Sequence, residues 1–227
     1  MVHHQSLSNL IPKYKLEKLV LGWLEEDTPS FDIAGAILED KPCQGIIVAK
    51  EKGIVAGLPF VETIFSTLDC TVEWFVKDGY VIDSIPTKIC RIKGSAKNVL
   101  LGERIALNVI ARCSGVATLS YKAIKIAAVK NYNGLIAGTR KTTPGFRLVE
   151  KYGMLVGGVD SHRMDLSSMV MLKDNHIDSI GNIKNAVAST KKYTGFHTKI
   201  EVECRSKADA EEAIVCGADV VMYLLFI

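Results

Sequence analysis

Hydrophobic positions change their spacing several times along the first half of the chain, and each change predicts a different element. One group of apolar residues recurs at helical spacing and predicts an amphipathic helix over residues 13–26: Leu16, Leu19, Val20, Trp23 and Leu24. Short β-rich runs separated by turn signals then predict strands: 45–49, 71–76 and 87–92. Residues 99–130 have a helical pattern, in which Gly115 predicts a break.

The second half alternates short apolar runs with helical stretches. The runs are each long enough for a strand: 135–137, 169–172, 200–204 and the run from residue 220 onward. The stretches between them predict helices: 148–156, 181–192 and 206–216. Alternating strands and helices are typical of a parallel sheet or barrel. We therefore expect an α+β domain over residues 1–111 and a barrel-like α/β domain over residues 112–227.

Composition narrows the class of protein. Hydrophobic residues make up 48% of the 227 positions and charged residues 23%, which is too apolar for a disordered chain. The formal net charge of +3 lacks the basic excess of a nucleic-acid binder. The six cysteines form no CxxC pair, and neither a secretory segment nor an apolar run of membrane-spanning length is present. We expect a cytoplasmic protein with free thiols and no nucleic-acid or membrane partner.

Basic side chains lie near the ends of the predicted strands in the second half. Arg140 and Lys141 follow the first strand, while His162 and Arg163 precede the next strand, which ends in Lys173. Because the carboxyl ends of parallel strands meet at one edge, we expect these side chains to converge. A cationic pocket of this kind is complementary to a ligand with several carboxylates or phosphates. The alternative is that they are separate surface cations on loops.

Acidic residues alternate along one predicted strand. In the run 199–204, Glu201 and Glu203 share one face, opposite Ile200, Val202 and Cys204. Glu203 therefore lies near the end of a predicted strand.

Several of these segments carry a resemblance to a known family. The sequence resembles the quinolinate phosphoribosyltransferases from residue 24 to residue 219, and five strings occur in that family's order: Leu101–Asn108, Gly138–Gly145, Ser161–Arg163, Leu172–His176 and Ile200–Glu203. The resemblance implies an N-terminal α+β sandwich domain followed by an α/β barrel of the type II phosphoribosyltransferase kind. It also implies transfer of phosphoribosyl from phosphoribosyl pyrophosphate to quinolinate with decarboxylation. The products would be nicotinate mononucleotide, CO₂ and pyrophosphate, as in de novo NAD synthesis.

The resemblance also implies roles for individual residues. It assigns quinolinate binding to one set of side chains: Arg104, Arg140, His162, Arg163 and Lys173. It assigns phosphoribosyl pyrophosphate to Lys141 and Glu203, a Mg²⁺ ligand to Glu203, and catalytic roles to Lys141, Lys173 and Glu203. Arg104 would reach into the neighbouring subunit's site, so the resemblance implies a homodimer or higher homo-oligomer with shared active sites. Mg²⁺ would be required, and no organic cofactor would be needed.

The sequence departs from the family pattern near residue 224. The family continues with an Asp-Asn pair and further strand–helix units, whereas Leu224 stands here at the aspartate position and the sequence ends at Ile227. We therefore expect an incomplete, open barrel, and no turnover by this chain alone. One alternative function is that of an inactive truncated isoform or paralogue that pairs with a full-length subunit. Another is nicotinate phosphoribosyl transfer, which the paired Arg140 and Arg163 argue against.

Overall fold

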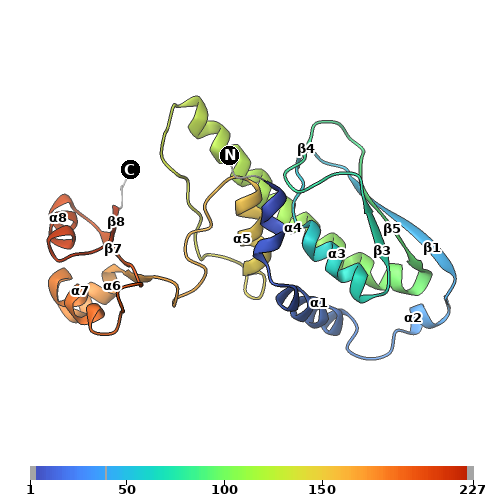
Figure 1. Ribbon diagram of the computed structural model, residues 1–227, viewed down its shortest axis with the longest axis horizontal. Helices are drawn as coiled ribbons and strands as arrows, with labels where there is room; N and C mark the ends of the chain where they lie inside the picture. The colour runs from blue at the N-terminus through green and yellow to red at the C-terminus, as the bar shows by residue number, and fades with distance from the viewer. Residues whose placement is uncertain (1–3, 39, 224–227) are drawn as a thin grey trace. The chain divides into compact units, whose positions relative to one another are not determined.

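The computed structural model describes residues 4–38 and 40–223, and the chain divides into two units, Met1–His162 and Arg163–Ile227 (Figure 1). The first unit contains the following elements in chain order: η1 (His4–Leu10), α1 (Lys13–Asp27), α2 (Ile33–Ala36), β1 (Pro42–Ala49), β2 (Gly53–Ile54), α3 (Leu58–Thr67), β3 (Thr71–Trp74), β4 (Val81–Ile82), β5 (Thr87–Ser95), α4 (Ala96–Val129) and α5 (Arg147–Val156). The second unit contains β6 (Val170–Leu172), α6 (Asp174–Ile180), α7 (Ile183–Lys191), β7 (Ile200–Cys204), α8 (Lys207–Val215) and β8 (Val220–Tyr223).

The first unit is built on an antiparallel sheet of order β1-β5-β3, with β5 in the centre. Helices α3 and α4 pack on one face of this sheet (Figure 1), and Cys90 and Ile92 of β5 are buried. Charged side chains of the same strands are partly exposed. Glu73 of β3 forms ion pairs with two cations of β5, Arg91 at 2.9 Å and Lys93 at 3.5 Å. The sheet therefore has one apolar face under helices and a charged array beside it, which confirms the predicted α+β segment.

Helix α4 runs without interruption from Ala96 to Val129, so the predicted break at Gly115 is wrong. The residues around this glycine hold the helix in place. The Ser114 hydroxyl accepts a hydrogen bond from the Ala56 N–H (3.0 Å), and the Thr118 hydroxyl accepts one from the Ile54 N–H of β2 (2.8 Å). Tertiary contacts on both sides therefore outweigh the weak helix propensity of one glycine.

Glycines let α5 lie close against α4. A Cβ atom at Gly153 would lie 2.6 Å from the Cys113 carbonyl oxygen, and one at Gly157 would collide with the Ala117 carbonyl oxygen. Only residues without a side chain permit this backbone-to-backbone approach. The position of α5 on α4 is therefore fixed by sterics at two points one helical turn apart.

A buried tyrosine fixes α5 to the segment that precedes α3. The Tyr152 hydroxyl donates a hydrogen bond to Asp78 (2.6 Å), and the other carboxylate oxygen of Asp78 accepts from the Gly57 N–H (2.8 Å). Burial, and then the charge of Asp78, raise the pKa of Tyr152. The Tyr152 ring also packs edge-to-face on Phe60 with centroids 5.6 Å apart. Helix α5 is thus held rigidly within the first unit.

The strand predicted over residues 135–137 does not form. Only an isolated parallel bridge forms there, between Ala137 and Asp160, and Leu135 is 83% exposed. The apolar run is therefore not buried as a sheet strand in this unit.

The second unit confirms the predicted alternation of strands and helices. Its sheet has the order β6-β7-β8 and all of its strand pairs are parallel. Ile200, Val202 and Cys204 of β7 are buried in its core, and Ser206 and Asp209 form a capping box at the start of α8. The chain is thus an α/β protein, as expected. Leu224, at which the family aspartate is expected, lies outside the described residues.

The predicted domain boundary at residues 111/112 falls inside the continuous helix α4. The contact-based division lies instead between His162 and Arg163, because α5 and the loops around it pack with the first unit. The predicted boundary separates two sequence domains, whereas the division at His162 separates two groups of packed residues. The predicted domain boundary therefore stays a prediction.

Two further expectations concern the chain as a whole. All six cysteines are free thiols, as predicted. Across residues 4–38 and 40–223, no helix combines the length and the apolar character that crossing a lipid bilayer demands.

Candidate active site

In the first unit, the Ala137–Asp160 bridge brings two of the predicted site segments together. The Gly138 N–H donates to the Asp160 carbonyl (2.7 Å), and the Asp160 N–H donates to the Ile136 carbonyl (2.9 Å). The paired segments run parallel, so the residues that follow each of them leave at the same end. Arg140 follows the first segment and His162 the second. The bridge therefore places Arg140 and His162 at the same end of two paired segments, and their convergence in a site stays a prediction.

The segment Gly138–Gly145, here called the substrate loop, is ordered by local hydrogen bonds. The Thr139 hydroxyl accepts from the Lys141 N–H (3.0 Å), and the Arg140 carbonyl accepts from the Thr142 N–H (2.9 Å). The Lys141 side chain is exposed. The Nε atom of Arg140 is buried and has no hydrogen-bond partner among the described residues. A buried donor without a partner is costly, and an anionic ligand is one way to satisfy the guanidinium.

Glu150 of α5 holds the far end of the substrate loop. Its carboxylate accepts from the Thr143 hydroxyl (2.7 Å), the Thr143 N–H (3.1 Å) and Nε of Arg112 on α4 (2.8 Å). The Glu150 side chain is only 7% exposed. Burial alone raises the pKa of this carboxyl, but the hydrogen bonds from Thr143 and Arg112 outweigh it, so the pKa lies below its ordinary value. Glu150 is therefore held as a carboxylate.

The next residue of α5 holds the second segment. Lys151 is 1% exposed, and its ammonium donates a hydrogen bond to the Ser161 carbonyl. His162 follows directly, with a positive φ of 55° and with its N–H donating to the Asp160 carboxylate (2.6 Å). A left-handed conformation at a non-glycine residue is uncommon and persists only where the surroundings enforce it.

In the second unit, Lys173 and Glu203 come together at the carboxyl ends of neighbouring strands. Lys173 follows β6, Glu203 lies near the end of β7, and their charged groups are 3.4 Å apart. The Glu203 side chain is 12% exposed, while Glu201 on the same face is buried. Arg163 donates to the Met169 carbonyl (3.0 Å), just before β6. Lys173 and Glu203 therefore form an ion pair at this sheet edge, and their roles in a site stay a prediction.

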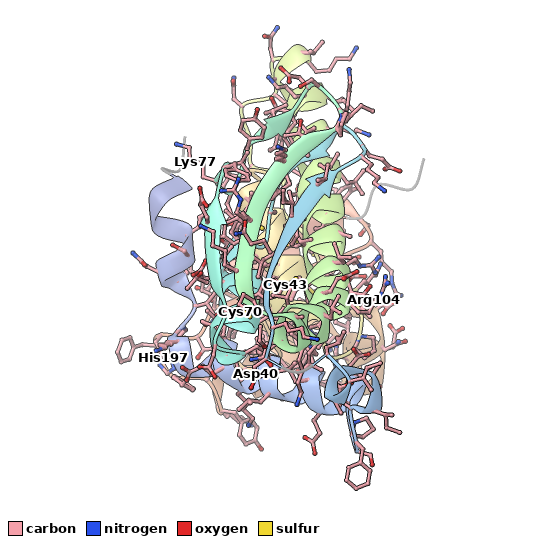
Figure 2. All side chains as sticks on the ribbon, turned by 90° about the vertical axis from the view of Figure 1, so that its right-hand side faces the viewer. Asp40, Cys43, Cys70, Lys77, Arg104 and His197 are labelled. Atoms are coloured by element: carbon pink, nitrogen blue, oxygen red, sulfur yellow. The ribbon has the colours of Figure 1, made fainter. Side chains whose placement is uncertain are left out.

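Arg104 lies apart from both sets. It occupies an exposed position on α4 and points outward from the helix (Figure 2). It makes no hydrogen bond or ion pair with any described residue. Its placement leaves the guanidinium free to contact another molecule, as the predicted role in a neighbouring subunit requires.

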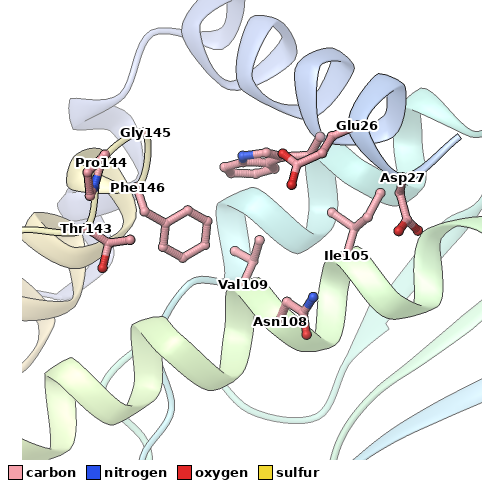
Figure 3. A pocket seen from close by; sticks show the side chains of 10 residues that line it. Glu26, Asp27, Ile105, Asn108, Val109, Thr143, Pro144, Gly145 and Phe146 are labelled. Carbon is pink, nitrogen blue, oxygen red and sulfur yellow. The ribbon is translucent and has the colours of Figure 1, made fainter. Parts of the chain in front are cut away.

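A cavity of about 280 Å³ lies beside the substrate loop, between the end of α1 and α4. Figure 3 shows Glu26 and Asp27 lining it from α1, Asn108 from α4, Thr143 from the substrate loop and Phe146 from the start of α5. Neither Arg140, Lys141 nor His162 lines it. Because its charged groups are carboxylates, this cavity does not have the chemistry of a dicarboxylate site.

The described residues contain no group of three or more His, Cys, Asp or Glu side chains arranged for a metal ion. Mg²⁺ commonly takes one or two protein carboxylates and completes its shell with substrate phosphates and waters. Glu203, partly exposed at the end of β7, has the oxygen ligand that such sharing needs. Glu203 is thus one carboxylate that a magnesium ion could share with other ligands, and the magnesium requirement stays a prediction.

The roles of Glu150, Arg112 and Lys151 were not predicted from the sequence. A signal was present, since Glu150 and Lys151 interrupt the apolar spacing of the helix predicted over 148–156. The pattern alone does not show burial, however, and Arg112 lies 38 positions away from Glu150 in the sequence.

The first unit is an antiparallel α+β unit and the second is a parallel strand–helix unit, and each carries cations near the ends of its parallel segments. These features define an α/β protein. The chain matches the models for the quinolinate phosphoribosyl transferase N-terminal domain over residues 30–114 and C-terminal domain over residues 116–224. It therefore belongs to the quinolinate phosphoribosyltransferase family.

Individual relatives agree with this assignment. The nicotinate-nucleotide pyrophosphorylase (carboxylating) of Dictyostelium discoideum is 45% identical over 95% of this chain and 77% of that protein. The Homo sapiens protein of the same name is 44% identical over 96% of this chain and 73% of its own length. Among solved structures, NadC from Streptococcus pyogenes superposes with a TM-score of 0.85 at 35% identity, covering 94% of this chain and 76% of that one.

Proposed function

We propose that the protein transfers a phosphoribosyl group from phosphoribosyl pyrophosphate to quinolinate, with loss of one carboxylate as CO₂. The observation that carries the proposal is the parallel pairing of Ala137 with Asp160, from which Arg140 and His162 leave at one end. Family membership supplies the reaction, because the relatives with 44–45% identity are named carboxylating nicotinate-nucleotide pyrophosphorylases. Quinolinate carries two adjacent carboxylates, which basic side chains such as Arg140 and His162 can bind.

The proposed quinolinate site uses guanidinium, imidazole and ammonium groups together. Arg140 and Arg163 provide planar forks that bind carboxylates through two hydrogen bonds each. His162 and Lys173 supply further donors. Arg104, exposed on α4, completes the site of a second copy of the chain in a homo-oligomer. A site with this many donors favours a dicarboxylate over a monocarboxylate.

The proposed phosphoribosyl pyrophosphate site uses Lys141 and Glu203. The exposed ammonium of Lys141 contacts phosphate oxygens. Glu203, 3.4 Å from Lys173, stabilises positive charge that develops on the sugar carbon as pyrophosphate departs. Glu203 is also the residue that would hold Mg²⁺, and the bound ion would neutralise the leaving pyrophosphate.

The cationic residues also serve the decarboxylation step. Ribosylation makes the ring nitrogen positively charged, and the electron pair left behind when the 2-carboxylate departs as CO₂ is stabilised beside that nitrogen. Lys173 and Arg163 provide fixed positive charge toward the carbanion, which then takes a proton to give nicotinate mononucleotide. No electron acceptor outside the substrate is required.

Two other functions compete with this proposal. Phosphoribosyl transfer to nicotinate would use one carboxylate and leave part of the cationic set without a partner. An inactive chain that only pairs with a full-length subunit would not need the Lys173–Glu203 pair or the substrate loop to be kept. The identity of 44–45% over nearly the whole chain favours the catalytic function over both alternatives.

A comparison of two acceptors tests the proposal. Because no turnover is expected from residues 1–227 alone, the test uses these residues within a complete barrel. With phosphoribosyl pyrophosphate and Mg²⁺, that protein is expected to convert quinolinate with a kcat/KM at least tenfold above that for nicotinate. A single charge-assisted contact is worth about 1.5–3 kcal/mol, and roughly 1.4 kcal/mol is a factor of ten. Product formation is followed by chromatography of nicotinate mononucleotide. Equal turnover of both acceptors would contradict a dicarboxylate site.

A further inference from the structure

Helix α5 presents two consecutive buried ionisable side chains, and each of them holds one segment of the proposed site. Glu150 binds the substrate loop at Thr143, and Lys151 binds the Ser161 carbonyl beside His162. Both loops therefore take their position from a single rigid element. That element is itself fixed on α4 by Gly153 and Gly157.

The contacts of Glu150 are more specific than packing requires. Its two carboxylate oxygens accept both the backbone N–H and the hydroxyl of Thr143, so the position and the side-chain rotamer of this residue are fixed together. Thr143 lies three positions after Arg140 in the substrate loop. A carboxylate with a side chain 7% exposed carries a desolvation cost that an apolar residue would avoid. Its hydrogen bonds to the loop and to Arg112 offset that cost.

Loop order matters for the proposed chemistry. Small misplacements of a substrate-binding group cost large factors in rate, on the order of a hundredfold for about 1 Å. A loop held only by its own turns would sample several positions for Arg140 and Lys141. A clamp at Thr143 reduces that freedom before the substrate arrives.

We propose that Glu150 is a positioning residue, which clamps the substrate loop through Thr143 and Arg112 so that Arg140 and Lys141 are preorganised for quinolinate and phosphoribosyl pyrophosphate. Glu150 contacts neither substrate. Lys151 performs the corresponding function for the segment that carries His162. This inference rests on the proposed function and names residues that act through others in the same site.

The test is a double-mutant cycle on quinolinate binding, measured by calorimetry with the intact protein. In Glu150→Gln, one carboxylate oxygen is replaced by an NH₂ group that faces donors and cannot accept. Thr143→Val keeps the shape of the side chain and removes its hydroxyl. Each variant is expected to raise the Kd for quinolinate about tenfold. The double variant is expected to raise it by clearly less than the product of the two single effects, because both variants remove the contact between Glu150 and the Thr143 hydroxyl.

Two further variants serve as controls. Thr143→Ser keeps the hydroxyl and is expected to restore the wild-type Kd. Glu26→Gln neutralises an exposed carboxylate that lines the cavity beside the same loop and is expected to leave the Kd unchanged. Thermal unfolding and the fraction of binding-competent protein are measured for every variant. A merely structural role would lower these two quantities and leave the Kd unaltered.

The outcomes separate the two proposals. Wild-type protein that neither binds nor turns over quinolinate overturns the proposed function. Wild-type protein that binds quinolinate, with folded Glu150→Gln of equal affinity or with additive effects in the cycle, overturns the positioning role alone. If Glu150→Gln does not fold, the quinolinate affinities of Thr143→Val and Thr143→Ser are compared, because the Glu150–Arg112 pair is intact in both variants. Equal affinity of these two variants overturns the positioning role of Glu150.

Discussion

The Arg104→Ala variant is expected to lose turnover by roughly 30-fold to several thousand-fold in kcat/KM, which corresponds to about 2–5 kcal/mol for one partner of a desolvated charge pair. The physical reason is the loss of a guanidinium that contacts a substrate carboxylate. Arg104 is exposed on α4 and makes no hydrogen bond or ion pair with a described residue, so its removal leaves the fold undisturbed. Lys122→Ala, an exposed cation on the same helix, is the matched control and is expected to retain full activity.

Mixed dimers test whether Arg104 acts in the site of the neighbouring subunit or in its own. When Arg104→Ala chains are paired with Arg140→Ala chains, one of the two shared sites contains both arginines and the other contains neither. Hybrid dimers isolated with two affinity tags should therefore regain about half of the wild-type activity, although each variant alone is strongly impaired. Failure of the demonstrated hybrid to recover activity would show that Arg104 does not act across subunits.

Neighbouring residues of the substrate loop are expected to separate the two substrates. Arg140→Ala should raise the Kd for quinolinate by roughly ten- to a hundredfold, because a charge-assisted hydrogen bond is worth about 1.5–3 kcal/mol. Lys141→Ala should instead weaken phosphoribosyl pyrophosphate by a similar factor. Both affinities are measured by calorimetry for both variants. Arg140→Lys keeps the charge but not the planar fork, so it should recover only part of the quinolinate affinity.

This pair of measurements also tests the assignment of roles within the loop. If Arg140→Ala weakens both substrates equally, the loop acts as one electrostatic patch and the separate roles are wrong. If Lys141→Ala leaves phosphoribosyl pyrophosphate binding unchanged, Lys141 is a surface cation.

The parts of the fold that the sequence predicts well are those with strong local patterns. Helix α1, the strands β6 and β7 and the helix α8 follow from apolar spacing, and α8 also has a capping box of Ser206 and Asp209. The errors fall where tertiary contacts decide. Gly115 does not break α4 because Ser114 and Thr118 tie the helix to the segment containing β2. Helix α3 was not predicted, although Pro59 at its start and the spacing of its apolar residues were readable signals.

The candidate site divides in the same way. Arg140, Lys173 and Glu203 stand near the ends of apolar runs, where sequence alone predicts chemistry in a parallel α/β fold. His162 was predicted only to precede a strand. Glu150 was not predicted, because its role depends on contacts with Arg112 and Thr143 that only the packing of α5 on α4 creates. A buried charge within an amphipathic helix has no local sequence signature that distinguishes it from an exposed one.

The most direct measurement of the central claim is the fate of the quinolinate 2-carboxylate. The protein with a complete barrel around these residues is incubated with phosphoribosyl pyrophosphate, Mg²⁺ and quinolinate labelled at that carboxylate, and released CO₂ and nicotinate mononucleotide are quantified together. The account predicts one labelled CO₂ for each nicotinate mononucleotide formed, and no nucleotide that retains the label. Nucleotide formed without release of labelled CO₂, or no nucleotide from protein that is folded and homogeneous, would contradict it.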